Sequence, residues 1–205
     1  MTIYDLKPAF QNLLRPISNA LANAGATANQ VTLAAMLLSI IVGVLFALYP
    51  TDRWAALLIP VWLFLRMALN AIDGMLAREH DMESRLGGIL NELGDVVSDT
   101  TLYLPFALVP GLPPALVVAI VIVAILTEMA GVVAVQIGAN RRYDGPMGKS
   151  DRAFGFGLLA FLLGLGLEPG YWSLAILTIM ALLSAVTVIN RCRKALAEAN
   201  GGTSA

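Results

Sequence analysis

Long apolar runs alternate with short polar stretches along most of this chain. A helix needs about 20 apolar residues to cross a bilayer. Six runs come close to or exceed that length, near 31–49, 54–77, 87–109, 114–138, 153–168 and 171–190. The pattern therefore predicts an all-α fold, a polytopic membrane protein with six transmembrane helices.

The segment before the first run is amphipathic rather than uniformly apolar. One helical face of residues 3–24 carries Phe10, Leu13, Leu14, Ile17 and Leu21. We expect an interfacial helix that lies on the cytoplasmic leaflet. A helix packed against the rest of the protein is the alternative. The segment does not resemble a secretory signal, because no apolar core precedes Ala28.

The chain shows no internal repeat, linker or low-complexity stretch. We therefore expect a single membrane-embedded domain over 1–200, with the six-helix bundle at 31–190 and a disordered tail at 201–205. Thr27 or Asn29 is expected to cap the first span, since both side chains accept hydrogen bonds from the first turn of a helix.

The basic residues predict the orientation in the membrane. Arg53 is the one basic residue in the connections predicted on one side, whereas the other side has eleven: Lys7, Arg15, Arg78, Arg85, Arg141, Arg142, Lys149, Arg152, Arg191, Arg193 and Lys194. Cytoplasmic connections carry the excess of Lys and Arg. We expect a bacterial-type inner membrane protein with both termini, and the polar cluster described next, on the cytoplasmic side.

The composition excludes several classes of protein. The chain is 58% hydrophobic and 13% charged, whereas a soluble domain carries about 25% charged residues. Its net charge is −1, so nothing attracts it to nucleic acid. With one cysteine, Cys192, and one histidine, His80, neither a disulfide framework nor a His-Cys metal centre is expected.

Polar side chains concentrate within the second and third runs, where ionisable residues are costly and mark function. Asn70 and Asp73 are three residues apart, and Asn91, Asp95 and Asp99 follow at steps of four, so each set shares one helix face. The short turn between the runs forces the helices to lie antiparallel and adjacent. Their hard oxygen ligands suit Mg²⁺ or Mn²⁺, as one or two ions.

The spacing of these residues resembles the signature of the CDP-alcohol phosphotransferase (CDP-alcohol phosphatidyltransferase) family, D-x2-D-G-x2-A-R-x8-G-x3-D-x3-D. The chain departs from it with Asn70 and Asn91 at the first and third acidic positions. The resemblance implies a transferase of phospholipid synthesis and a homodimer. Such an enzyme moves a phosphatidyl or phosphoalcohol group from a CDP-linked donor to an alcohol hydroxyl and releases CMP.

The resemblance also assigns roles to the matched positions. Asp73 would hold the cation against the diphosphate of the donor, and Asp95 would be the general base that takes the proton of the acceptor. The implied metal ligands are Asp73, Asn70, Asn91 and Asp95. The positions implied to meet the nucleotide and its phosphates are Gly74, Ala77, Arg78 and Gly87.

Basic residues between the fourth and fifth runs are further candidates. They would bind a phosphate of the acceptor or donor, or they reflect only the cytoplasmic excess of positive charge: Arg141, Arg142, Lys149 and Arg152.

Three charged residues lie deep in the predicted spans. Arg66, Asp99 and Glu128 sit about 18–20 Å from the cytoplasmic ends of their helices at about 1.5 Å per residue. An unpaired charge at that depth is costly, so we expect Arg66 to pair with Asp99, Glu128 or both. Binding of substrate by Arg66 is the alternative.

We expect CDP-diacylglycerol as the donor and a small polar alcohol as the acceptor, although the sequence does not name the alcohol. The reverse arrangement, with the lipid as acceptor, is also open. The two losses of charge leave a second hypothesis, a catalytically degenerate membrane protein that binds CDP-lipid or nucleotide. A small transporter is less favoured, because the chain has no inverted repeat.

Overall fold

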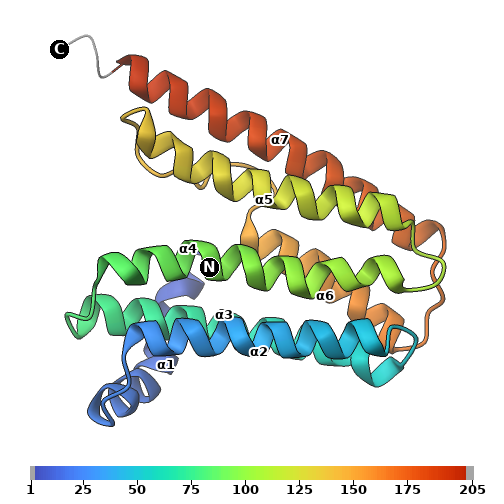
Figure 1. The fold of residues 1–205 in the computed structure, drawn as a ribbon, viewed down its shortest axis with the longest axis horizontal. Helices are drawn as coiled ribbons and strands as arrows, with labels where there is room; N and C mark the ends of the chain where they lie inside the picture. The colour runs from blue at the N-terminus through green and yellow to red at the C-terminus, as the bar shows by residue number, and fades with distance from the viewer. Residues whose placement is uncertain (1–2, 202–205) are drawn as a thin grey trace. The chain divides into compact units, whose positions relative to one another are not determined.

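The protein is helical throughout the residues that the structure, a computed structural model, describes. These are residues 3–201, with side chains from residue 9 onward. They form seven α-helices and one 3-10 helix and contain no strand, which confirms the all-α prediction. The elements in Figure 1 are α1 (Ile3–Asn23), α2 (Ala28–Leu48), α3 (Arg53–Glu79), α4 (Arg85–Tyr103), η1 (Leu104–Leu108), α5 (Pro114–Gln136), α6 (Lys149–Gly164) and α7 (Tyr171–Gly201).

A helix is present at each of the six predicted positions, but not all of these helices have the properties of a span. Of the described helices, four are long and apolar enough to cross a membrane, namely α2, α3, α5 and α7. Helix α4 carries several charges, and α6 has 16 residues. The structure therefore confirms an all-helical protein with four candidate membrane spans. The count of six spans stays a prediction.

Several helix ends differ from the predicted boundaries. Helix α6, predicted at 153–168, begins at Lys149 and ends at Gly164. Helix α4 ends at Tyr103, and the 3-10 helix η1 follows it up to Leu108. Pro105 explains this, because proline lacks the backbone N–H and disfavours helix in the residue before it. Helix α7 continues to Gly201, well beyond the predicted end at 190. Its extension is rich in alanine, a strong helix former. Gly201 is thus helical, and residues 202–205 of the predicted tail lie outside the described residues.

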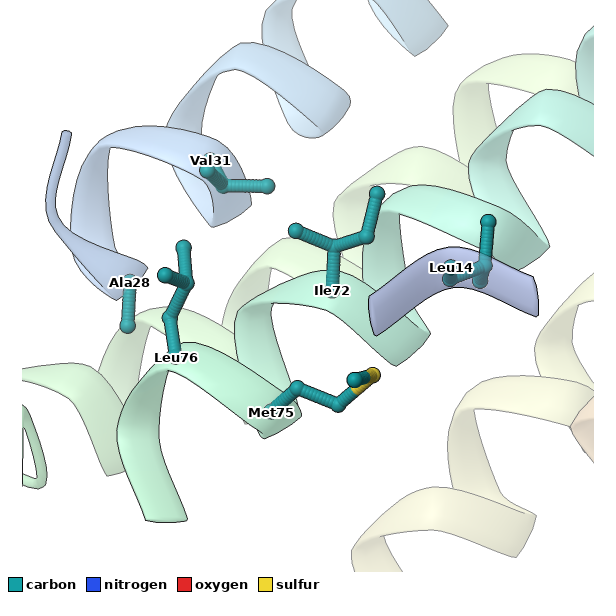
Figure 2. Close-up of a cluster of buried hydrophobic side chains, with 6 residues drawn as sticks. All are labelled: Leu14, Ala28, Val31, Ile72, Met75 and Leu76. Atoms are coloured by element: carbon teal, nitrogen blue, oxygen red, sulfur yellow. The ribbon is translucent and has the colours of Figure 1, made fainter. Parts of the chain in front are cut away.

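Helix α1 packs against α3 along part of its apolar face. Leu14 is buried in a cluster with Ile72, Met75 and Leu76 of α3, which Figure 2 shows together with Ala28 and Val31 of α2. In contrast, Leu13 is 71% exposed and Ile17 51% exposed. The apolar face is therefore shared between the protein and its surroundings, and the interfacial position of α1 stays a prediction.

The N-terminus of α2 has a reciprocal cap. The backbone N–H of Gln30 donates to Thr27 Oγ1 at 3.3 Å, and the N–H of Thr27 donates to Gln30 Oε1 at 2.9 Å. This capping box satisfies two N–H groups that have no partner within the helix. Of the two expected caps, Thr27 fills the role.

The chain divides into two compact units. The first, Met1–Val42 with Val61–Asp99, contains the signature. The second comprises Gly43–Pro60 and Thr100–Ala205. Within the second, Gly43 meets the backbone of Thr101 so closely that an added Cβ would lie 2.1 Å from the carbonyl oxygen. Only glycine permits that approach of α2 to α4.

Candidate active site

The turn between α3 and α4 fixes the beginning of the second signature helix. Ser84 caps α4 by accepting a hydrogen bond from the N–H of Gly87 at 2.9 Å, and Asn29 Nδ2 donates to the same hydroxyl oxygen at 3.3 Å. A Cβ on Gly87 would lie 2.7 Å from Asn29 Oδ1. The signature glycine therefore lets α2 approach the first turn of α4.

Asp73 of α3 is buried against α2. It is 6% exposed, and Thr32 Oγ1 donates a hydrogen bond to its Oδ2 at 2.9 Å. The carbonyl oxygen of Ala28 also lies within hydrogen-bond distance of Thr32 Oγ1, at 3.1 Å, and is the alternative acceptor for its one hydrogen. Helix α2 thus orients the carboxylate of Asp73, a contact that the sequence analysis did not anticipate.

Asp95 of α4 is held by two residues of α3. Arg66 Nη2 donates to Asp95 Oδ1 at 3.2 Å and to its backbone carbonyl at 3.3 Å. Asn70 Nδ2 reaches the same Oδ1 at 3.5 Å. Asn70 and Asp95, the first and last acidic positions of the signature, are therefore in contact.

Arg66 also forms the predicted pair with Asp99. Its Nη1 lies 2.5 Å from Asp99 Oδ1, and both residues are buried, at 3% and 6% exposure. One guanidinium thus joins two carboxylates of α4, and Arg66 is a charge-neutralising link between α3 and α4.

The remaining signature positions are more open. Arg78 is exposed, and its guanidinium lies over Gly74, where an added Cβ would be 2.9 Å from Nη2. Asn91 is exposed on α4, and Ala77 packs beside the cluster of Figure 2. Gly74 thus allows Arg78 to fold back along its own helix.

The signature positions supply oxygen donors of the kind that a divalent cation prefers. Among the described residues, no three His, Cys, Asp or Glu side chains are arranged to hold a metal ion. The signature instead offers two carboxylates, Asp73 and Asp95, with the amide oxygens of Asn70 and Asn91. All are hard oxygen donors.

A second charged cluster lies within the second unit, around Glu128 of α5. Glu128 forms ion pairs with Arg152 at 2.7 Å, Arg141 at 3.1 Å and Arg191 at 3.3 Å. Arg152 and Arg191 are almost wholly buried. Arg191 also donates to the carbonyl of Thr127 at 2.6 Å. Glu128, expected as a possible partner of Arg66, is therefore neutralised by arginines from α6, α7 and the α5–α6 connection.

Arg142 and Lys149 are placed differently from these arginines. Arg142 pairs with Asp144 at 2.7 Å and Glu198 at 2.5 Å. Hydrogen bonds from Lys194 and then Arg142 hold the pKa of the Asp144 carboxyl below its ordinary value. Lys149 is the first residue of α6 and is half-buried. Arg142 is thus bound to two carboxylates at the surface.

Thr32 and Arg191 are among the polar residues of these clusters that the sequence did not single out as site residues. Thr32 is the one residue with a hydroxyl group in the first turn of the predicted run at 31–49. A lone hydroxyl in an apolar run is a signal that could have identified it. Arg191 was counted only among the basic residues that predict orientation. Its contact with Glu128 joins residues 63 positions apart, and spacing along the chain does not reveal such a pair.

The sequence is similar to known proteins over most of its length. Residues 26–190 match the CDP-alcohol phosphatidyltransferase family. The chain is 47% identical over 196 residues to the inner membrane protein YnbA of Escherichia coli (strain K12), covering 96% of this chain and 97% of the relative. It is 28% identical to the phosphatidylinositol phosphate synthase of Mycolicibacterium smegmatis, over 90% of this chain and 84% of that one.

The fold is similar to that of solved structures. Two are crystal structures of the phosphatidylinositol phosphate synthase of Mycobacterium tuberculosis. The complex with manganese and citrate has a TM-score of 0.74 at 18% identity and covers 88% of both chains. The form with CDP-DAG bound has a TM-score of 0.70 at 19% identity, over 90% of this chain and 92% of that one. At these identities the likeness establishes the shared fold.

Proposed function

The chain belongs to the CDP-alcohol phosphatidyltransferase family, a family of phosphotransferases, and from this premise we propose that it moves a phosphatidyl group from CDP-diacylglycerol to a small alcohol and releases CMP. The observation that carries the proposal is the contact of Asn70 with Asp95, which joins the first and last acidic positions of the signature. A structural neighbour with CDP-DAG bound supports the choice of donor.

In this proposal Asp95 is the general base. It accepts the proton of the acceptor hydroxyl as that oxygen attacks the phosphorus. Arg66 and Asn70 both contact Asp95 Oδ1 and so fix the direction of the carboxylate. Positioning of this kind accounts for much of the rate of phosphoryl transfer.

The donor binds at the start of the signature. Asp73, Asn70, Asn91 and Asp95 would hold a Mg²⁺ or Mn²⁺ ion, which would supply positive charge to offset the charge that develops on the departing CMP. The exposed Arg78 is proposed to pair with a phosphate as a two-pronged donor, and Gly74, Ala77 and Gly87 are proposed to lie beside the nucleotide. The manganese in a structural neighbour supports a divalent cation.

The acceptor is proposed to carry an anionic group. Arg141 and Arg152 are proposed to bind this group, as is Lys149 at the beginning of α6, whereas Arg142 is engaged by Asp144 and Glu198. The four basic residues that the chain places over 141–152 support a phosphorylated acceptor alcohol over a neutral one.

We further propose an inner membrane location with six spans, both termini and the active site on the cytoplasmic side, and a homodimer. The name of the relative YnbA, an inner membrane protein, supports the location. The eleven basic residues on one predicted side support the orientation.

A second candidate function is binding of a CDP-lipid without turnover. The observation that favours it is the loss of two carboxylates, since Asn70 and Asn91 stand at acidic positions of the signature and Asn91 is exposed. Amide oxygens bind a cation more weakly than carboxylates do. A metal site of this kind would hold a donor but stabilise its leaving group less well.

The test is CMP release from CDP-diacylglycerol by the full chain in detergent micelles. Mg²⁺ or Mn²⁺ is added or withheld, and the acceptors are glycerol 3-phosphate, inositol 1-phosphate, inositol and serine. We expect CMP release that requires a divalent cation and a phosphorylated acceptor. Saturable donor binding with no CMP release from any acceptor would instead establish the binding protein.

Restoring the acidic signature tests the metal ligands directly. Asn70→Asp and Asn91→Asp each add a negative charge, and we expect each to tighten Mn²⁺ binding by roughly tenfold, or ~1.4 kcal/mol. Asn70→Asp also turns its hydrogen bond with Asp95 into a repulsive contact. The metal-free Tm of that variant should therefore fall and recover when Mn²⁺ is added. Isothermal titration and thermal melts measure both effects.

The matched control is Asn23→Asp, which makes the same change at an exposed residue that ends α1. It should leave Mn²⁺ affinity and Tm as they are. If Mn²⁺ affinity is unchanged in both signature variants, neither Asn70 nor Asn91 is a ligand.

A further inference from the structure

A cavity of about 550 Å³ lies within the second unit. Three chain turns line it, the first leading into α3, the second leading into α5 and the third joining α6 to α7. Its volume falls in the range of about 300–1,000 Å³ that is usual for small-molecule sites. None of the signature residues lines it.

Every charged residue of these three turns lines the cavity, and two of the turns supply them. Residues 49–53, 104–113 and 165–170 contain Asp52, Arg53 and Glu168 and no other charged side chain. All three line this cavity. Charges contributed by turns far apart in the sequence have thus been brought to one place, on turns that are otherwise uncharged.

Two tryptophans fix the acidic turns. Trp54 Nε1 donates to Asp52 Oδ2 at 3.1 Å, and Trp172 Nε1 donates to the backbone carbonyl of Glu168 at 2.9 Å. The guanidinium of Arg53 lies against Gly166, where an added Cβ would be 2.6 Å from Nη2. Gly166 has φ +91°, which also favours glycine. The cation and the two carboxylates are therefore held on ordered turns.

Aromatic side chains mark the depth of the cavity in the membrane. Tyr49 is 45% exposed, Trp54 50% and Tyr171 93%, and each belongs to or adjoins one of the three turns. Exposed Tyr and Trp gather at the level of the lipid headgroups. The side chains of Val109, Leu163 and Leu167 add an apolar part to the lining. A molecule that is charged at one end and apolar at the other matches these surroundings.

We propose that this cavity binds a phospholipid headgroup that carries a phosphodiester and a primary ammonium. Arg53 pairs with the phosphate as a two-pronged donor, and Asp52 and Glu168 accept from the ammonium. Asp52, Arg53 and Glu168 together carry one more negative than positive charge. This net negative charge disfavours a headgroup that is only anionic. A quaternary ammonium has no N–H to donate to the carboxylates, which favours the primary amine.

Native mass spectrometry of the full chain, delipidated in detergent, tests the proposal. Equal amounts of phosphatidylethanolamine, phosphatidylcholine and phosphatidylglycerol are added with matched acyl chains. We expect one retained phosphatidylethanolamine, at an occupancy at least about fivefold above the other two, and a raised Tm with this lipid. The experiment measures lipid binding, so its result does not depend on whether the protein releases CMP.

Two sets of variants separate the cavity from general lipid contact. Arg53→Gln, and Asp52→Asn combined with Glu168→Gln, should each lower that occupancy at least about fivefold. The controls Arg193→Gln and Glu83→Gln remove exposed charges elsewhere and should leave it unchanged. Equal retention of the three lipids, or unchanged retention in both cavity variants, overturns the proposal. Equally tight binding of soluble glycerophosphoethanolamine would assign the cavity to a soluble ligand and overturn the lipid.

Discussion

Asp95→Asn is expected to lower the rate of CMP release by at least about a hundredfold, the usual lower contribution of a general base. The substitution keeps the shape of the side chain but removes its ability to take a proton. The protein should stay folded, because Arg66 keeps its buried pair with Asp99. The measurement is kcat for CMP release from CDP-diacylglycerol, beside a thermal melt of the same sample.

Asp73→Ala should abolish CMP release for a different reason, the loss of a ligand to the cation. The cost in stability should be small, because the hydroxyl of Thr32 retains a second acceptor in the carbonyl of Ala28. Mn²⁺ affinity should fall strongly in this variant. The control Asp81→Asn changes an exposed carboxylate in the adjoining turn, where asparagine tolerates the positive φ of +54°. Full activity in either signature variant would remove that residue from the site.

The sequence was sufficient to locate the helices because apolar length is a local property. Each predicted run coincides with a helix to within a few residues at most ends. The exceptions have local causes too. Pro105 ends α4 early, and the alanine-rich stretch after Asn190 lets α7 continue where the apolar pattern stops. Helix α1 differs, since periodicity defines an apolar face but does not say what covers each part of it.

The candidate site could be predicted along each helix but not between helices. The step of four grouped Asp95 with Asp99, and the guanidinium of Arg66 contacts both. Asn70 and Asp73, three residues apart, have different partners: Asn70 contacts Asp95 of α4, and Asp73 accepts from Thr32 of α2. The donation of Thr32 to Asp73 depends on how α2 packs beside α3, which no spacing encodes. The contacts of Arg66 with two carboxylates of α4 also depend on the rotation of both helices.

The partners of Glu128 also could not be predicted from its depth in the membrane. Distance from a helix end gives the level of a charge in the membrane, but not the direction in which its side chain points. Its observed partners Arg152 and Arg191 come from later helices. Those arginines satisfy a buried carboxylate that would otherwise be costly.

Arg66→Met is expected to destabilise the protein by about 3–5 kcal/mol, the usual cost of removing one partner from a buried ion pair. For a chain of this length that corresponds to a fall in Tm of roughly 6–20 °C. The cause is the carboxylate of Asp99, which is 6% exposed and loses a partner at 2.5 Å. The loss of Arg66 costs less at Asp95, because the side chain of Asp95 is 23% exposed and retains the contact with Asn70.

The structure specifies which second substitution restores stability. Adding Asp99→Asn to Arg66→Met removes the stranded charge, so much of the lost Tm in detergent should return. Adding Glu128→Gln is the matched control, because Glu128 is already neutralised by three arginines and its loss strands those instead. Recovery with Asp99→Asn alone identifies Arg66 as the link between α3 and α4. If Asp99→Asn fails to raise the Tm while Arg66→Met raises the KM for the donor, Arg66 binds substrate instead.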